Sequence, residues 1–174
     1  MKKRTRILGL LMILLLGLGG CGFHLRGQVP GTVSDKTVMV TGMTQGGVYG
    51  NYVAHLNSIG GRITQKSSDA VAIINIASIK HIRRPITLSS IGRANMFDLT
   101  FRVIYDIKSP KGETLVPERE INIRREYFNT QTEPLSQSLE EGLIRAEMEK
   151  EAALVLLRQS IKVIQDRQSP APSP

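Results

Sequence analysis

Between residues 97 and 107, apolar side chains alternate with polar ones, and this period of two constrains the fold more than any other feature. The apolar members of the series are Phe97, Leu99, Phe101, Val103, Tyr105 and Ile107. A strand with this pattern buries one face and leaves the other in water. The sequence SPKG at 109–112 suits a tight turn, and a return strand follows with Ile121, Ile123 and Tyr127 facing inward. The pattern therefore predicts an antiparallel hairpin with one buried face.

Two more strands are predicted before this hairpin. Residues 37–40 read as a short first strand. The run that begins at Ala70 is β-branched and almost continuously apolar, as expected of a central strand.

Helical spacing of apolar residues predicts one helix after the first strand and a longer one after the hairpin. The first helix uses Tyr49, Val53, Leu56 and Ile59, and Gly60 and Gly61 end it. In the second helix the inward residues are Ile144, Met148, Ala152 and Val155. We expect it to begin at a capping box of Ser138 and Glu141 and to continue to about Ile164.

The predicted element order is β-α-β-β-β-α, which gives an α+β sandwich. We expect a small four-stranded sheet with two helices packed on one face, forming a single domain over residues 37–165. Residues 166–174 are rich in proline and have no apolar side chains to bury, so we expect a disordered tail.

The N-terminal residues predict a signal peptide rather than a retained membrane-spanning helix. Basic residues at 2–6 precede an apolar run at 7–18, which is shorter than the roughly 20 residues that a span needs. Cys21 is the only cysteine, and LGGC resembles a bacterial lipobox, whose cysteine carries diacylglycerol on its sulfur and an acyl chain on its amine. We therefore expect removal of residues 1–20, lipidation at Cys21 and a tether over 21–36. Gly22 after the cysteine resembles lipoproteins that are sorted to the outer membrane.

Positive charge is concentrated in the first half of the domain. The formal net charge is +8, and there is no acidic residue between Asp69 and Asp98. This interval contains a basic segment that we expect to run from the end of the core strand through a loop; its residues are Lys80, His81, Arg83, Arg84 and Arg93. Arginine forks bind phosphate groups in pairs of hydrogen bonds, so the loop is a candidate phosphate site. An ordinary solvated loop is the alternative.

The sequence gives little sign of catalysis or of a metal or nucleotide cofactor. There is no G-x-S-x-G element or glycine-rich phosphate loop, and His24, His55 and His81 lack metal-ligand spacing. The acids of the last helix read as ion-paired, solvated surface; they are Glu140, Glu141, Glu147, Glu149 and Glu151. Nucleic-acid binding is disfavoured because the chain has no tryptophan and is predicted to be exported.

The stretch CGFHLRG at 21–27, directly after the lipobox, resembles the start of the mature lipoproteins of the LptE family, and the element order agrees with that family. The resemblance implies an outer-membrane lipoprotein that plugs the LptD β-barrel and assists its assembly and the delivery of lipopolysaccharide to the cell surface, with no covalent reaction. It also implies that basic residues contact lipopolysaccharide, and the corresponding loop offers Arg93, with Lys80, Arg83 and Arg84 upstream. The helix start departs from the family, because it offers Gln137 and no basic residue before Arg145.

Two other functions stay open at this stage. One is a lipid-anchored adaptor or auxiliary binding subunit of another cell-envelope complex. The other is an envelope hydrolase, for which the sequence offers no pair of nucleophile and base.

Overall fold

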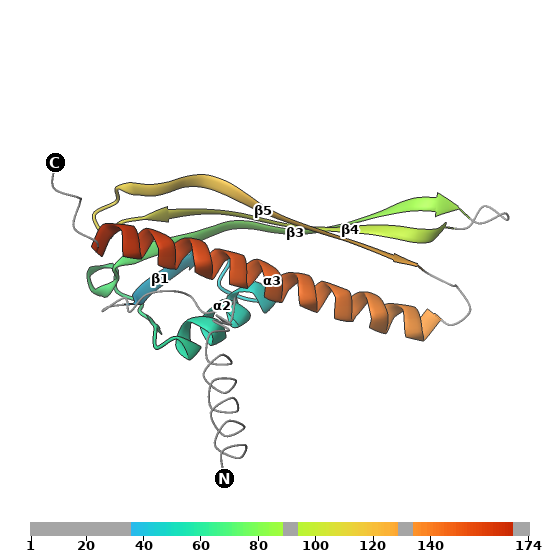
Figure 1. Cartoon of the computed structure of the whole chain (residues 1–174), viewed down its shortest axis with the longest axis horizontal. Coiled ribbons are helices and arrows are strands. Elements are labelled where there is room, and N and C mark those ends of the chain that lie inside the picture. The colour runs from blue at the N-terminus through green and yellow to red at the C-terminus, as the bar shows by residue number, and fades with distance from the viewer. Residues whose placement is uncertain (1–35, 89–93, 129–133, 169–174) are drawn as a thin grey trace, which may run out of the picture. The chain divides into compact units, whose positions relative to one another are not determined.

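The computed structural model describes residues 36–88, 94–128 and 134–168, and these form one α+β domain (Figure 1). Its elements are β1 (Thr37–Gly42), α2 (Gly47–Ser58), β2 (Arg62–Ile63), the 3₁₀ turn η2 (Ser67–Asp69), β3 (Ala72–Leu88), β4 (Ala94–Lys108), β5 (Thr114–Phe128) and α3 (Pro134–Gln168). The predicted fold class is confirmed. The predicted signal peptide, the tether up to residue 35 and Arg93 lie outside the described residues.

The sheet has five strands in the order β2-β1-β3-β4-β5, where four strands were predicted. The additional strand, β2, contains only Arg62 and Ile63 and pairs in parallel with β1. Two residues are too few to produce a detectable period, which explains the difference. The strand β1 also runs parallel to β3, whereas β3, β4 and β5 are antiparallel.

A β-bulge at Ala77 changes which residues of β3 face the helices. Ile76 lies opposite Tyr105 and Ser78 lies opposite Ile104, so Ala77 has no partner on β4. Before the bulge the even-numbered residues are buried, as with Ile76 at 0 % exposure. After it the odd-numbered residues lie opposite the buried residues of β4. One extra residue therefore reverses the inward and outward alternation along a 17-residue strand.

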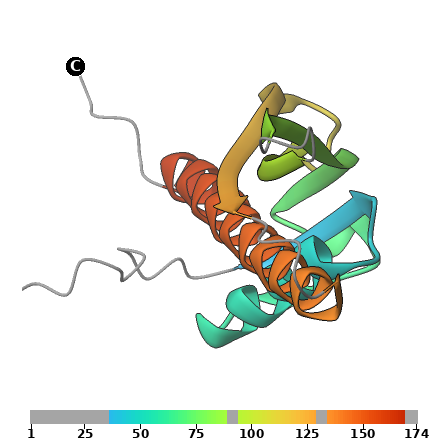
Figure 2. The ribbon, with the colours of Figure 1, turned by 90° about the vertical axis from the view of Figure 1, so that its right-hand side faces the viewer.

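The two helices cover one face of the sheet, and α2 packs beside α3 (Figure 2). Their contact includes a buried hydrogen bond of 3.0 Å between the hydroxyls of Tyr52 and Ser160. Burial raises the pKa of Tyr52. The buried face of α3 is apolar over its second half, at Met148, Ala152, Ala153, Leu156, Leu157, Ile161 and Ile164. The core therefore lies under the second half of α3.

Three boundary and orientation predictions need correction. The inward residues of α2 are Val48, Tyr52 and Leu56, so the predicted helical face is rotated by about one residue. Gly60 ends the helix as predicted, with a positive φ of 77°.

The helix α3 begins at Pro134, so Ser138 lies inside the helix and the predicted capping box is wrong. At its other end α3 extends to Gln168, so residues 166–168 of the predicted tail are helical.

Candidate interaction surface on strand β3

The basic segment lies in a strand up to Arg84, including the part that was predicted as a loop. Residues 80–84 lie within β3 and pair with β4 from Arg102 to Asp98. The prediction of a loop was wrong for Arg83 and Arg84, because the apolar run that indicates the strand ends at Ile82, whereas β3 continues as a mostly exposed strand to Leu88. The basic residues are therefore held at fixed positions along a sheet.

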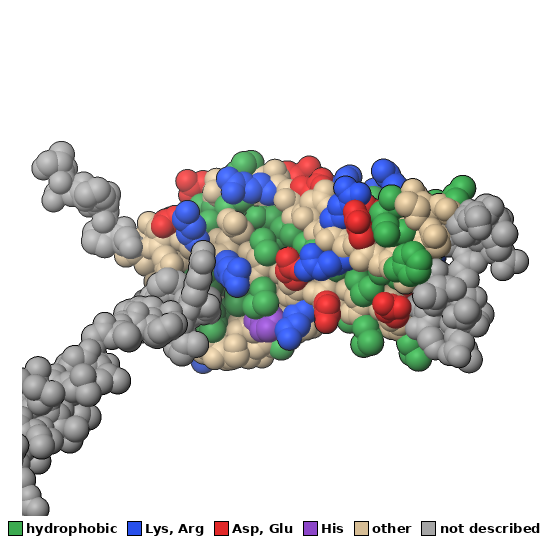
Figure 3. All heavy atoms as spheres, turned by 45° about the vertical axis from the view of Figure 1, so that its right-hand side comes forward, with side chains coloured by type: hydrophobic (Ala, Val, Ile, Leu, Met, Phe, Trp, Pro, Cys, Tyr) green, Lys and Arg blue, Asp and Glu red, His purple; other side chains and the backbone are tan. Residues whose placement is uncertain are grey.

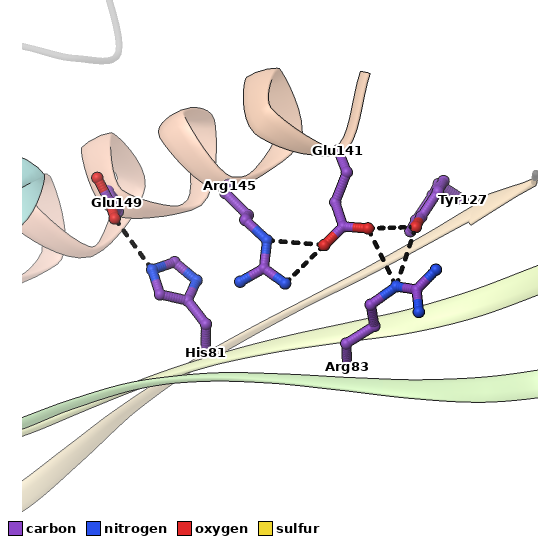
Figure 4. Close-up of polar contacts among 6 residues, drawn as sticks. All are labelled: His81, Arg83, Tyr127, Glu141, Arg145 and Glu149. Atoms are coloured by element: carbon purple, nitrogen blue, oxygen red, sulfur yellow. Dashed lines mark hydrogen bonds and ion pairs between the residues drawn. The ribbon is translucent and has the colours of Figure 1, made fainter. Parts of the chain in front are cut away.

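The bulge at Ala77 divides these basic residues between the two faces. His81 and Arg83 point toward α3, where they meet Glu149 and Glu141 (Figure 4). Lys80 and Arg84 alternate with them and therefore lie on the opposite, open face. The four basic side chains do not form one cluster.

Arg83 is fixed by a polar network that joins β3, β5 and α3 (Figure 4). Its Nε lies 3.0 Å from Oε2 of Glu141 and donates to the Tyr127 hydroxyl at 3.2 Å. Tyr127 donates to the same Glu141 oxygen at 2.5 Å. Arg145 donates to Oε1 of Glu141 from Nε at 2.9 Å and from Nη2 at 2.6 Å. Both oxygens of Glu141 are therefore used.

The electrostatics of this network favour an ionised Glu141. Partial burial acts against the charge, but the hydrogen bonds from Tyr127 and Arg145 and the charges of Arg145 and Arg83 outweigh it, so the pKa of Glu141 is lowered. Burial, followed by the hydrogen bond to Glu141, raises the pKa of Tyr127. The guanidinium of Arg83 also lies 3.5 Å above the Phe97 ring, a cation–π contact.

Two further contacts hold α3 on the sheet. His81 Nε2 lies 3.0 Å from Oε1 of Glu149, and its ring packs on Phe101 with 4.4 Å between centroids. Arg125 of β5 pairs with Glu151. The predicted ion pairing of the helix acids is confirmed for Glu141 with Arg145, but Glu141, Glu149 and Glu151 also reach across to the strands. The spacing along the helix could indicate only the first kind of pair.

The open face of the sheet pairs most of its charges internally. Arg124 pairs with Asp98, and Arg102 lies 2.9 Å from Glu120. Lys80 and Arg84 are exposed and make no ion pair with any of the described residues. These two side chains are the cations of β3 that remain available to an anionic ligand, and we call them the open-face pair.

Large exposed hydrophobic side chains lie near the ends of β3 and β5 and in the first turns of α3, and Figure 3 shows hydrophobic atoms on this part of the surface. They are Ile86, Leu88, Phe128, Leu139 and Leu143, with exposures from 43 % to 71 %. Scattered apolar residues are common on protein surfaces, and only a contiguous apolar patch of several hundred Å² marks a contact surface.

The described residues contain no group of three or more metal-ligating side chains. Nor is any helix in this part of the chain long and apolar enough to cross a membrane. A cavity of about 340 Å³ lies at the other end of the domain, between Pro110 at the β4–β5 turn and Ile164 and Arg167 of α3. It is remote from the basic residues of β3.

The Glu141 network predicts a stability contribution that depends on pH. Because the pKa of Glu141 is lowered in the folded protein, its contribution is complete above the ordinary glutamate pKa of 4.5 and is lost as the pH falls through the folded pKa. We expect Glu141→Gln to lower the free energy of unfolding at pH 7 by about 1–2 kcal/mol, since charge-assisted hydrogen bonds are replaced. The difference from the unchanged protein should shrink below about pH 4, as measured by urea unfolding.

The matched control for this change is Glu140→Gln, which removes the same charge from an exposed neighbour on the same helix turn. Its unfolding free energy should stay within about 0.5 kcal/mol of the unchanged protein. A Glu141→Gln deficit that is the same at acidic and neutral pH would contradict the assigned role of the carboxylate.

Comparison with known families identifies relatives that cover most of the chain. Residues 40–160 match the family model described as LptE, lipopolysaccharide-assembly. The chain is 30% identical over 164 residues to a protein of Photorhabdus laumondii named LPS-assembly lipoprotein LptE. That alignment covers 92% of this chain and 88% of the Photorhabdus protein.

Solved structures show the same fold at lower sequence identity. The crystal structure of rare lipoprotein B from Shewanella oneidensis has a TM-score of 0.66 at 19% identity, covering 76% of this chain and 99% of that one. The solution NMR structure of an uncharacterized lipoprotein B from Nitrosomonas europaea has a TM-score of 0.67 at 24% identity, covering 86% and 99%. These likenesses support the architecture described above.

Proposed function

We propose the following role for this chain, which belongs to the LptE family of lipopolysaccharide-assembly proteins. It acts at the outer membrane as a lipid-anchored, non-enzymatic subunit that occupies the LptD β-barrel, supports assembly of the barrel and helps to deliver lipopolysaccharide to the cell surface. The observation that carries this proposal is the family match, which spans the domain from β1 to α3.

The anchor in this proposal is Cys21. It follows a basic and then an apolar segment and stands directly after Gly19 and Gly20. Two or more acyl chains on one residue hold a protein stably on a membrane, because each buried methylene contributes about 0.8 kcal/mol. The segment from Cys21 to Lys36 then connects the lipid to β1.

Lipopolysaccharide contact is proposed for the open-face pair, Lys80 and Arg84. Both are exposed on the side of the sheet that the helices leave uncovered, and neither makes an ion pair with the described residues. Phosphate groups would supply the missing counter-charge. Arg93, which lies outside the described residues, extends the same proposal. Arg83 differs from these because it is paired with Glu141 on the helix-covered face.

The function is tested in cells of the source bacterium from which the chain has been depleted. Depletion should reduce the amount of lipopolysaccharide at the cell surface, and the unchanged chain should restore it. A Lys80→Glu/Arg84→Glu variant should restore it only in part. Its affinity for purified lipopolysaccharide should fall on the order of tenfold and depend less on salt, since two charge-assisted contacts are reversed.

A matched control is Arg158→Glu/Lys162→Glu, which changes two exposed cations on α3 by the same total charge. This control should restore surface lipopolysaccharide fully. Equal loss in both double variants would assign the effect to net charge, and undisturbed surface lipopolysaccharide after depletion would refute the proposed function itself.

A further inference from the structure

We propose that Arg83, Arg145 and Tyr127 form a phosphate-binding site that Glu141 occupies as an internal ligand. A phosphate group that displaces Glu141 would bridge Arg83 and Tyr127 of the sheet to Arg145 of α3. The site differs from the open-face pair because it lies on the helix-covered side of β3. The inference rests on the proposed function only for the source of the phosphate, a lipid headgroup, and not for the site itself.

The geometry is that of an anion site with a carboxylate already bound. Donors from β3, β5 and α3 converge on one group, and they use both of its oxygens (Figure 4). Arg145 directs Nε and Nη2 at Oε1 of Glu141, while Arg83 and Tyr127 share Oε2. Converging guanidinium and hydroxyl donors are the arrangement that recognises phosphate oxygens.

The charges favour phosphate over the internal carboxylate. Arg83 and Arg145 together carry two positive charges, and Glu141 supplies one negative charge. A phosphate monoester carries a charge of about −1.5 to −2 at neutral pH and offers three strong acceptor oxygens. It would therefore neutralise both guanidinium groups, which Glu141 alone does not do.

The network is open to solvent on one side. The exposed fraction of the side chain is 40% for Arg83, 30% for Arg145 and 19% for Glu141. An incoming phosphate can therefore reach the two arginines without entering the hydrophobic core. The exposed hydrophobic residues Leu139 and Leu143 belong to the same turns of α3.

Glu141 can leave the site at little cost in hydrophobic burial. From Ser138 to Glu147 no side chain is buried, and Met148 is the first buried residue among the α3 side chains that the structure describes. Beyond that point Glu149 and Glu151 continue to hold the helix through His81 and Arg125. The Glu141 side chain can therefore turn away from the site without disturbing the buried part of α3.

The test measures binding of inorganic phosphate and of purified lipopolysaccharide to the full chain and to its Glu141→Gln variant. If Glu141 leaves the site open about one-tenth of the time, removing its charge should raise phosphate affinity about tenfold. Glu140→Gln, which removes the same charge outside the network, should bind as the unchanged chain does. An affinity of Glu141→Gln equal to that of Glu140→Gln for both ligands would overturn the proposal.

Two further measurements identify the site and the source of the phosphate. Adding Arg145→Gln to Glu141→Gln should abolish the gain in affinity; a gain that persists would overturn the assignment of the site.

Lipopolysaccharide stripped of its phosphate groups should show no gain in affinity for the Glu141→Gln variant, and a gain with it would also overturn the proposal. A gain seen only with intact lipopolysaccharide supports a lipid headgroup as the source, and a gain with inorganic phosphate too supports a general phosphate site. Neither outcome depends on co-purification with a barrel, so failure here leaves the proposed function untouched.

Discussion

Deletion of Ala77 is expected to destabilise the domain by more than about 3 kcal/mol, because it removes the residue that reverses the alternation of β3. Without the bulge, either the segment ending at Ile76 or the segment starting at Ile79 must turn its inward side chains outward. The first choice exposes Ile74 and Ile76, which are both fully buried. The second removes His81 from its contact with Glu149. Urea unfolding followed by circular dichroism measures the loss.

The control for the deletion is Ala77→Ser, which keeps the register of the strand. Ala77 is exposed, so this substitution should change the free energy of unfolding by no more than about 0.5 kcal/mol. If the deletion were tolerated as well as the substitution, the bulge would not be the feature that sets the two faces of β3.

Cys21→Ala is expected to move the protein from the membrane fraction to the soluble fraction of the cell envelope. The reason is that the acyl chains proposed for Cys21 contribute about 0.8 kcal/mol for each buried methylene, and alanine cannot accept them. Fractionation followed by mass spectrometry of the intact protein checks both the location and the lost lipid mass.

A substitution in the tether that leaves the cysteine in place, Gln28→Ala, serves as the control and should remain in the membrane fraction. If Cys21→Ala also stayed there with an unaltered mass, lipidation at this residue would be excluded, and the anchor would have to be sought elsewhere.

Local patterns were sufficient to predict most of the fold. The alternation from Phe97 to Ile107 predicted β4, and the two glycines after residue 59 predicted the end of α2. The bulge at Ala77 was not predictable, since it depends on how β3 pairs with β4 and carries no glycine or proline signal. The start of α3 was misplaced because Ser138 and Glu141 have capping-box spacing, although Glu141 is engaged by side chains of the sheet.

The candidate site was only partly predictable for the same reason. The sequence grouped the basic residues of β3 by their proximity along the chain, whereas the structure separates Arg83 from Lys80 and Arg84. Tyr127 was predicted to face inward, but its hydrogen bond to Glu141 joins two elements and leaves no local signal. The resemblance to the LptE family, in contrast, is confirmed by the family match and by the Photorhabdus relative. It could be recognised from the sequence because a short motif and an element order need no knowledge of tertiary contacts.

The most direct test of the central claim is to purify the full-length protein from detergent-extracted membranes through a C-terminal tag and to quantify bound proteins by mass spectrometry. We predict an outer-membrane β-barrel of the LptD type at a one-to-one ratio after stringent washing. Recovery of the protein without a barrel, or with an inner-membrane complex in its place, would contradict this account and favour an adaptor of another envelope complex.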